Sequence, residues 1–373
     1  MTVNAVSHTC QWWRLAPGSC RMVLVPSGED GGREGGERCR RVGCADVPIA
    51  VTGSVATDHL MSFPGLFAES LVVEQLDKIA LSFLVQDLEV RRGGCAANIA
   101  FGLAALGVRP VLVAAVGEDF ADYRSWLERH GVDCAALHYS ETRHTARFIC
   151  TTDRSHAQIA SFYAGAMSEA RDIELRPVSD RVGGLDLVVV APNDPEAMLR
   201  HTKECRDRGY AFVADPSQQL AWSDGDTIRQ LITGAAYLFS NEYEAALIEQ
   251  KTGWTTPDVL KQVETRVVTL GRGGVRIERD GDEPWTVDAV GGVTAVEPTG
   301  VGDAFRAGFL AAAAASLSTR RAAQTGCVLA AYVVERVGTQ EYAFTAKEFC
   351  CRVNDGYGEE AAGEIADWLL PSC

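Results

Sequence analysis

Short apolar runs alternate with helical patterns from Val47 onward, and this alternation constrains the fold most strongly. Each run is followed within two residues by Gly, Asp, Asn or Pro and is largely apolar, as expected of strands buried on both faces of a parallel sheet. The runs are Pro48–Thr52, Pro110–Val116, Leu185–Ala191, Ala211–Ala214, Ala236–Phe239 and Arg266–Leu270, with helical patterns at Ala96–Leu106, Glu196–Arg208 and Thr227–Thr233. The pattern predicts a doubly wound α/β fold with a mostly parallel central sheet flanked by helices.

Two segments break this rhythm, at about residues 66–92 and 141–167. In the second, Thr142–Thr152 and Gln158–Tyr163 flank the polar turn Asp153-Arg154-Ser155, which is typical of a β-hairpin. Both segments contain strand-forming residues that do not fit the layered body. We therefore expect them to form a small β-sheet lid over the strand ends, where lids exclude water and position reactants.

Residues 1–46 differ in composition, with a Gly- and Glu-rich stretch at residues 28–37, four cysteines and no sustained apolar period. This composition predicts a disordered extension, which leaves one domain over residues 47–373. A net charge of −15 argues against nucleic acid as a partner, because nonspecific binding needs a basic surface. The sequence contains no apolar run of about 18 residues, so no membrane span is expected.

The twelve cysteines are scattered and include no Cys-x-x-Cys pair, which argues against a zinc site. Without a secretory signal they are best interpreted as buried small side chains or free thiols in a reducing compartment. The sequence therefore predicts a soluble cytoplasmic protein.

A glycine turn, Gly300-Val301-Gly302, is followed at once by Asp303 and a helix-forming run rich in alanine. The two glycines let backbone N–H groups face a common point, and the start of the helix adds its positive dipole end. We predict an anion hole of Gly300, Val301 and Gly302 for a phosphoryl group. Asp303 would accept a proton from an attacking hydroxyl group, although ordinary helix capping explains this motif equally well in isolation.

Polar residues follow several of the other predicted strands, where ligands bind in open α/β sheets. Asp58 comes after the first run, Gly93-Gly94 precedes a helix that carries Asn98, and Asn241 with Glu244 follows the fifth run. Residues 269–274, Thr-Leu-Gly-Arg-Gly-Gly, follow the sixth run. Each feature alone could be a turn, a cap or a solvated surface.

Taken in this order, the set resembles the ribokinase-like (PfkB) carbohydrate kinase family over about residues 47–345. Longer stretches resemble the adenosine kinases of mycobacteria and related actinobacteria, namely Val51–Met61, His144–Phe148, Ala214–Leu220 and Asp303–Leu310. This resemblance implies ATP-dependent phosphorylation of the adenosine 5′-hydroxyl to AMP, with ADP as the second product, in purine salvage. Asp303 would be the general base.

The resemblance also implies roles for individual positions. A nucleoside would be bound by Ser54, Asp58, Ser82, Gly94, Asn98, Phe148, Phe162, Gln218 and Gln219, with the two phenylalanine rings stacked on a purine. ATP would be bound by Gly302, Asn241, Thr269, Leu270, Gly271, Arg272, Gly273 and Gly274, while Glu244 orders Mg²⁺ through water. The family leaves a monovalent cation open and implies a homodimer that pairs through the lid.

Three positions depart from the resemblance. Glu297 stands where the family motif begins with Asp and is expected to alter the water around Mg²⁺, Cys95 lies in the Gly-Gly turn, and Trp222 follows Gln218-Gln219. A sugar kinase of the same family, acting on ribose or fructose, is an alternative, and so is a catalytically silent nucleotide-binding protein. A nicotinamide-dependent dehydrogenase is excluded because Gly53-Ser54-Val55-Ala56 lacks the Gly-x-Gly-x-x-Gly pattern.

Overall fold

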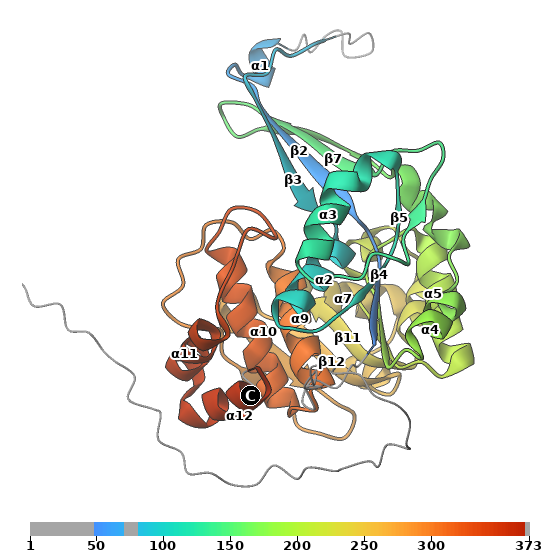
Figure 1. Cartoon of the computed structure of the whole chain (residues 1–373), viewed down its shortest axis with the longest axis vertical. Helices are drawn as coiled ribbons and strands as arrows, with labels where there is room; N and C mark the ends of the chain where they lie inside the picture. The colour runs from blue at the N-terminus through green and yellow to red at the C-terminus, as the bar shows by residue number, and fades with distance from the viewer. Residues whose placement is uncertain (1–47, 71–80, 370–373) are drawn as a thin grey trace, which may run out of the picture. The chain divides into compact units, whose positions relative to one another are not determined.

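The computed structural model describes residues 48–70 and 81–369, all within the compact unit Val42–Cys373 (Figure 1). The predicted N-terminal extension lies outside the described residues, as do residues 71–80 of the first predicted lid segment. In the described part of the chain, no helix combines the length and the apolar character that a membrane span requires.

An eight-stranded sheet forms the centre of this unit, in the order β14-β13-β12-β11-β10-β9-β1-β4. Six strands are parallel and correspond to the six predicted runs: β1 (Ile49–Thr52), β4 (Val111–Val113), β9 (Leu187–Val190), β10 (Phe212–Ala214), β11 (Ala235–Asn241) and β12 (Val263–Thr269). Two antiparallel strands that the sequence did not predict extend one edge, β13 (Val275–Glu278) and β14 (Trp285–Val287). The predicted run Pro110–Val116 divides, since its end forms β5 (Ala115–Val116), which pairs with β6 (His138–Tyr139).

The direction in which successive strands are added reverses at β1. Its neighbours are β4 on one side and β9 on the other, and β10, β11 and β12 continue on the β9 side. At such a switch point the loops leave the sheet in opposite directions and open a crevice at the carboxyl ends of the strands. The fold therefore predicts a ligand site beyond the ends of β1 and β9.

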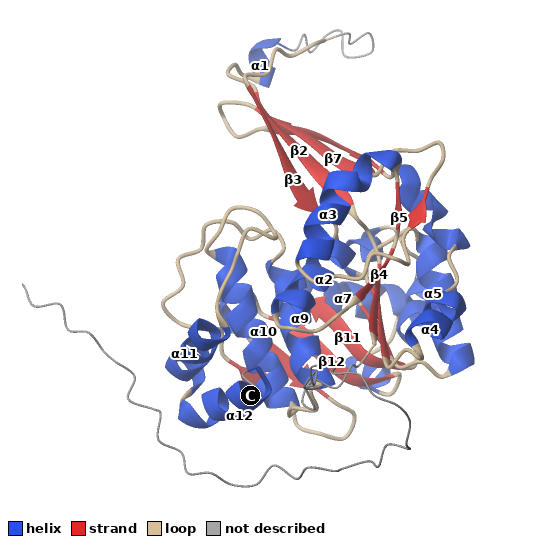
Figure 2. Ribbon diagram, viewed as in Figure 1, coloured by secondary structure: helices blue, strands red, loops and turns tan. Residues whose placement is uncertain are grey.

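Helices cover both faces of the sheet (Figure 2). Successive side chains along a strand point to opposite faces of the sheet and so belong to two separate cores. In β1, for example, Val51 belongs to one core and Ala50 to the other. One core is covered by α2 (Cys95–Ala105), α3 (Ala121–Arg129), α9 (Val301–Ala314), α10 (Thr319–Val334), α11 (Ala346–Tyr357) and α12 (Glu359–Leu369). The other is covered by α4 (Leu175–Val182), α5 (Pro195–Arg208), α6 (Gly225–Ile232), α7 (Glu242–Thr252) and α8 (Thr256–Leu260).

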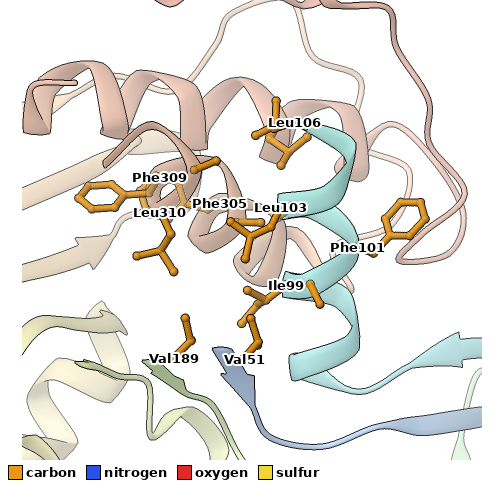
Figure 3. Packing of buried hydrophobic residues seen from close by; sticks show 14 of the residues in the cluster. Val51, Ile99, Phe101, Leu103, Leu106, Val189, Phe305, Phe309 and Leu310 are labelled. Carbon is orange, nitrogen blue, oxygen red and sulfur yellow. The ribbon is translucent and has the colours of Figure 1, made fainter. Parts of the chain in front are cut away.

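The first core brings α2 and α9 together above β1 and β9 (Figure 3). Ile99 and Leu103 of α2 are fully buried, as are Phe309 and Leu310 of α9 and Val51 of β1. Short 3₁₀ helices lie in the connections, η2 (Glu118–Phe120), η3 (Gly165–Asp172), η4 (Ser217–Ala221) and η5 (Gly271–Gly273), and a single-turn helix α1 spans Phe67–Ser70. This layered architecture confirms the predicted doubly wound fold.

A second sheet of four strands has the order β3-β2-β7-β8, and only its β2–β7 pair is parallel. Its strands are β2 (Ala56–Ser62), β3 (Asp87–Gly93), β7 (Ala146–Thr152) and β8 (Gln158–Tyr163). The sequence analysis placed the start of this region at about residue 66 and so missed β2. Most β2 residues are half-buried without the alternation of a one-sided strand, which explains the error. Asp58 therefore lies on a strand of the second sheet.

Two glycines let α9 and α10 pack unusually closely. A Cβ atom at Gly308 of α9 would lie 2.8 Å from the Cα atom of Gly326 and 2.8 Å from the carbonyl oxygen of Thr325, both on α10. These backbone atoms cannot move without shifting a helix, so this contact limits how α9 can be placed.

The substitution Gly308→Ala should lower the free energy of unfolding by about 1–3 kcal/mol, because the added methyl group overpacks this contact. The matched control is Gly363→Ala in α12, where the glycine is exposed and an added Cβ meets no atom within 4 Å. The control should raise stability by about 0.5–1 kcal/mol through helix propensity. Urea unfolding monitored by circular dichroism would measure both, and a stabilised Gly308→Ala variant would contradict the close packing.

Candidate active site

A cavity of about 720 Å³ lies between the second sheet and the carboxyl ends of the main-sheet strands. It occupies the switch point, because residues that follow β1, β9 and β10 all contribute to its wall. Most of the residues singled out in the sequence line it: Ser54, Asp58, Gly94, Asn98, Phe148, Phe162, Gln218, Gln219, Asn241, Glu244, Thr269, Gly271, Gly300, Gly302 and Asp303.

Six predicted residues are not among those that line this cavity: Ser82, Val301, Leu270, Arg272, Gly273 and Gly274. Ser82 is exposed in the segment that leads to β3. Gly274 has a φ of +86°, and a Cβ atom there would come within 2.0 Å of the Val287 carbonyl oxygen. This glycine is thus required by the close approach of β14. Val301 packs partly buried against the first core.

The glycine turn before α9 has the shape that an anion hole needs. Gly300 has a left-handed φ of +77°, and a Cβ atom there would lie 2.8 Å from the Thr339 side chain. Both Gly300 and Gly302 line the cavity. The Val301 N–H donates a hydrogen bond of 3.3 Å to the Pro298 carbonyl oxygen, whereas the N–H groups of Gly302 and Asp303 have no partner within the helix and are available to an anion, as is usual for the first turn.

Asp303 lies in the first turn of α9 and lines the cavity. The Asn98 Nδ2 atom donates a hydrogen bond of 2.8 Å to Asp303 Oδ2. Burial raises the pKa of Asp303 to about 6, although the nearby Arg306 guanidinium and the Asn98 hydrogen bond lower it. A carboxylate with such a pKa is ionised at neutral pH and has a higher proton affinity than ordinary aspartate, as suits a general base.

Asn98 is held by a buried network that the sequence analysis did not predict. Its Oδ1 atom accepts hydrogen bonds from Thr339 Oγ1 at 2.8 Å and from Gln340 Nε2 at 2.9 Å. The Gln340 side chain in turn bonds to the Tyr123 hydroxyl group at 2.6 Å. Because both acceptor positions of Asn98 are occupied, its amide group is fixed toward Asp303, and one Nδ2 hydrogen remains for a ligand.

A buried ion pair supports the opposite side of Asp303. Arg306, one turn further along α9, lines the cavity and contacts Asp215, which follows β10 and is 1% exposed. The sequence analysis did not assign either residue to the site. Asp215 directly follows a predicted strand, and Arg306 is the only basic residue of a helix whose one other charged residue is Asp303, so both signals were present in the sequence.

The part of the cavity nearest the second sheet presents polar groups from β2 and the Gly-Gly turn. Gly94 has a φ of +94°, and a Cβ atom there would lie 2.6 Å from the Ser54 carbonyl oxygen, so the turn requires glycine. Burial raises the pKa of Asp58 above its usual value. The positive charge of Arg91 acts in the opposite direction, and the negative charge of Glu297 adds to the increase. Among the residues that the structure describes, none donates a hydrogen bond to the Asp58 carboxylate, which leaves its oxygen atoms available to ligand hydroxyl groups.

Two aromatic rings from the second sheet border the same space. Phe148 of β7 and Phe162 of β8 are direct cross-strand partners, and both line the cavity. Phe162 is 53% exposed, which is high for so large an apolar side chain. Trp222 also lines the cavity and is 88% exposed. The turn that carries Trp222 is fixed by Lys251, whose Nζ atom donates to the carbonyl groups of residues 220, 221 and 223.

The other end of the cavity is built around the start of α7. Asn241 and Glu244 form a reciprocal capping box, with both hydrogen bonds at 2.8 Å. Ser217 Oγ donates to the second Glu244 oxygen at 3.2 Å. Within residues 48–70 and 81–369, no group of three or more His, Cys, Asp or Glu side chains could hold a metal ion. A single carboxylate fits Mg²⁺ that arrives with a nucleotide, since that ion keeps water and phosphate oxygens as most of its ligands.

The remaining departures from the expected pattern have structural explanations. Glu297 accepts a hydrogen bond from Arg91 Nη1 at 2.9 Å and another from the Gly338 backbone N–H at 3.0 Å. It therefore joins β3 to the segment that leads into the glycine turn. Cys95 lines the cavity, and burial raises the pKa of its thiol well above the usual value, so it is a poor nucleophile.

Comparison with known proteins identifies relatives over most of the chain. The profile of the pfkB family of carbohydrate kinases matches residues 57–346. The structure of a Burkholderia thailandensis nucleoside kinase in complex with inosine is similar, with a TM-score of 0.72 and 31% identity over 83% of this chain and 98% of that chain. The nucleoside kinase of Methanocaldococcus jannaschii is 28% identical over 294 residues, which are 78% of this chain and 92% of that protein.

The fold, the glycine turn with its carboxylate and these relatives together define the class of protein, a kinase that transfers a phosphoryl group to a small molecule. The chain belongs to the pfkB family of carbohydrate kinases. This confirms the family expected from the sequence. The narrower likeness to actinobacterial adenosine kinases is not supported, because the relatives described above are nucleoside kinases. An adenosine kinase from Sinorhizobium meliloti shares the fold, with 19% identity and a TM-score of 0.59.

Replacing Asp303 with Asn should stabilise the protein at pH 7.5, because burial of this carboxylate opposes its ionisation. The pKa of Asp303 is about 6 in the fold against 3.8 for an unperturbed group, which corresponds to at most about 3 kcal/mol. Because the pKa of Asp303 is higher in the folded than in the unfolded protein, the free energy of unfolding of the wild type falls as the pH rises from about 4 to 6. The Asn variant can still accept the hydrogen bond from Asn98.

Urea unfolding at several pH values would measure this difference in stability. The advantage of Asp303→Asn should be largest above pH 6 and should vanish near pH 4. Asp280→Asn, in an exposed turn, is the matched control and should show no such pH-dependent gain. An Asp303→Asn variant that is less stable than wild type at pH 7.5 would show that the carboxylate is not under electrostatic strain.

Proposed function

We propose that the protein is a nucleoside kinase, which transfers the γ-phosphoryl group of ATP to the 5′-hydroxyl group of a purine nucleoside. The observation that carries this proposal is the composition of one cavity. Phe148 and Phe162 border it on the second sheet, while Asp303 and the glycine turn of α9 lie on its other wall. A flat apolar surface suits a base, and the carboxylate suits a hydroxyl group that must lose a proton.

The relatives support a nucleoside as the acceptor. The Burkholderia kinase has been seen with inosine, and in another structure with ADP and inosine. Asp58 and the free Nδ2 hydrogen of Asn98 would pair with the ribose hydroxyl groups, since a carboxylate accepts from two adjacent hydroxyls. Adenosine remains the acceptor proposed from the sequence, to be compared with inosine and guanosine.

The proposed reaction assigns one task to each of these groups. The 5′-oxygen would attack the γ-phosphorus, its proton would pass to Asp303, and the bridging oxygen would leave with ADP. The N–H groups of Gly300 and Gly302 would donate hydrogen bonds to the phosphoryl oxygens. These hydrogen bonds would stabilise the negative charge on the phosphoryl group as the bond to ADP breaks. Release of AMP or IMP would complete the turnover.

The nucleotide would occupy the end of the cavity lined by Asn241, Thr269 and Gly271. Glu244 would hold Mg²⁺ there through water, because its two oxygens already accept hydrogen bonds within the protein. When bound, the ion would neutralise phosphate charge. Neutralisation of the phosphate charge matters especially here, because the carboxylates of Asp58 and Asp303 line the same cavity.

The decisive test is phosphate transfer from ATP and Mg²⁺ to adenosine, inosine, guanosine, ribose and fructose, each offered separately, with products identified by mass. We expect nucleoside 5′-monophosphates from the purine nucleosides. Asp303→Asn should lower kcat by at least about 10²-fold while it retains nucleoside binding measured by calorimetry. Preferred transfer to a free sugar would replace the nucleoside proposal with a sugar kinase, and no transfer to any acceptor would indicate a silent nucleotide-binding protein.

The stacking role of the aromatic pair can be tested separately. Phe148→Ala should lower kcat/KM for purine nucleosides by about tenfold or more, because base–aromatic stacking contributes ~1–3 kcal/mol. Transfer to ribose, where measurable, should change little. Phe83→Ala is the matched control, since Phe83 belongs to an aromatic cluster with Phe63 and Phe67 and does not line the cavity. Equal losses in the two variants would exclude stacking by Phe148.

A further inference from the structure

The cavity has an unfavourable charge for a reaction of ATP. Three carboxylates line it, those of Asp58, Glu244 and Asp303, and the whole chain has a formal charge of −15. Among the described residues that form the wall, Arg306 is the only basic side chain. A phosphoryl group in this space would therefore depend on Arg306 for side-chain positive charge.

The guanidinium group of Arg306 is held in one orientation. Its Nη2 atom donates a hydrogen bond of 2.6 Å to Asp215 Oδ1, and its Nε atom lies 2.6 Å from Asp215 Oδ2. The Phe239 ring packs against it, with 5.6 Å between the Arg306 Cζ atom and the ring centroid. Arg306 is 6% exposed and Asp215 is 1% exposed. These contacts leave the guanidinium little freedom to rotate.

The third corner of the guanidinium group points toward the glycine turn. A Cβ atom at Gly302 would come within 2.9 Å of Arg306 Nη1, so this nitrogen lies directly against the anion-hole residue. No acceptor for a hydrogen bond from Nη1 occurs in the described part of the chain. The structure thus has an oriented cationic donor beside Gly302 and one helical turn from Asp303.

We propose that Arg306 is a catalytic residue whose Nη1 atom donates a hydrogen bond to the transferring phosphoryl group, and that Asp215 is the positioning residue that aims it. As the acceptor oxygen forms its bond to the γ-phosphorus, the bond to the bridging oxygen breaks and its electron pair remains on ADP. The acceptor's proton goes to Asp303. Negative charge on the three equatorial phosphoryl oxygens is then stabilised by Arg306 Nη1 together with the N–H groups of Gly300 and Gly302.

The burial of this ion pair supports a functional role. A buried pair seldom stabilises a protein more than an apolar pair of similar volume, because both charges must lose their water. Arg306 and Asp215 connect α9 to the end of β10, and an apolar contact could make the same connection. An arginine whose Nη1 atom has no acceptor within the described residues and lies on the cavity wall is explained better by a ligand that carries negative charge.

The test compares Arg306→Gln with Arg266→Gln in the full-length protein. Arg266 is a matched control, because it is 1% exposed, pairs with Glu249 at 2.8 Å and lies outside the cavity. Arg306→Gln should lower kcat by about 10²–10³-fold, the usual effect of removing one transition-state donor, with the KM for the acceptor within about threefold. Arg266→Gln should lose stability but keep kcat within about threefold.

Two further measurements separate catalysis from structure. Added guanidinium ion at millimolar concentration should restore part of kcat to Arg306→Ala and none to Asp303→Asn. Asp215→Asn should lower kcat about tenfold, since the guanidinium remains but loses its orientation. If Arg306→Gln does not fold, the double variant Asp215→Asn/Arg306→Gln removes both charges and leaves no unpaired buried ion, and the same loss of kcat is expected from it.

The proposal would be overturned by a folded Arg306→Gln or double variant with kcat within about threefold of wild type, or by an equal loss in Arg266→Gln. It depends on the proposed function only in that phosphoryl transfer occurs in this cavity. The acceptor used is whichever one the wild type phosphorylates best, and ATP hydrolysis without acceptor is measured in parallel. Transfer to a sugar would therefore refute the nucleoside proposal, while the comparison of the arginine variants would still decide this one.

Discussion

The placement of α9 is the constraint on which the site depends. This helix carries the glycine turn, Asp303 and Arg306, and it is held by contacts that only very small residues allow. A Cβ atom at Gly102 of α2 would lie 2.6 Å from the Cβ of Ala307, and Gly308 lies similarly close to α10. Because backbone atoms and short side chains meet at these points, α9 has little room to slide, and Asn98 of α2 comes within hydrogen-bond distance of Asp303.

The second sheet is connected to the same helix through charged residues of β3. Arg91 contacts Glu297 just before the glycine turn, while Arg92 lies over the Trp126 ring at 4.0 Å and pairs with Glu341 at 3.2 Å. Glu297 therefore has a defined partner, which accounts for a carboxylate one methylene longer than the aspartate of the family pattern. The consequence is that the sheet bearing Phe148 and the glycine turn before α9 are positioned by one set of contacts.

The sequence was sufficient to predict the six parallel strands, because strands buried on both faces have a clear apolar signal. It did not predict β2, which is half-buried, or β14, which lies at the edge of the main sheet, and it missed the short strand β13, in which two of the four residues are charged. It placed Asp303 and Asn98 in one site but not in contact, and it missed the Arg306–Asp215 pair, whose members are separated by 91 residues. Ser82 was assigned by resemblance alone, and the structure places it outside the cavity lining.

The burial of Asp303 links the chemistry proposed for the cavity to the stability of the fold. In the proposed role of general base, Asp303 would act on a hydroxyl group without competition from water because it is partly buried. That burial raises its pKa and opposes folding at neutral pH. A fixed cation near the carboxylate limits this penalty, and Arg306 lowers the pKa of Asp303 in this way. In the proposed mechanism the same cation would also face the phosphoryl group, so that a single buried residue would serve both the ionisation of Asp303 and the charge of the transferred group.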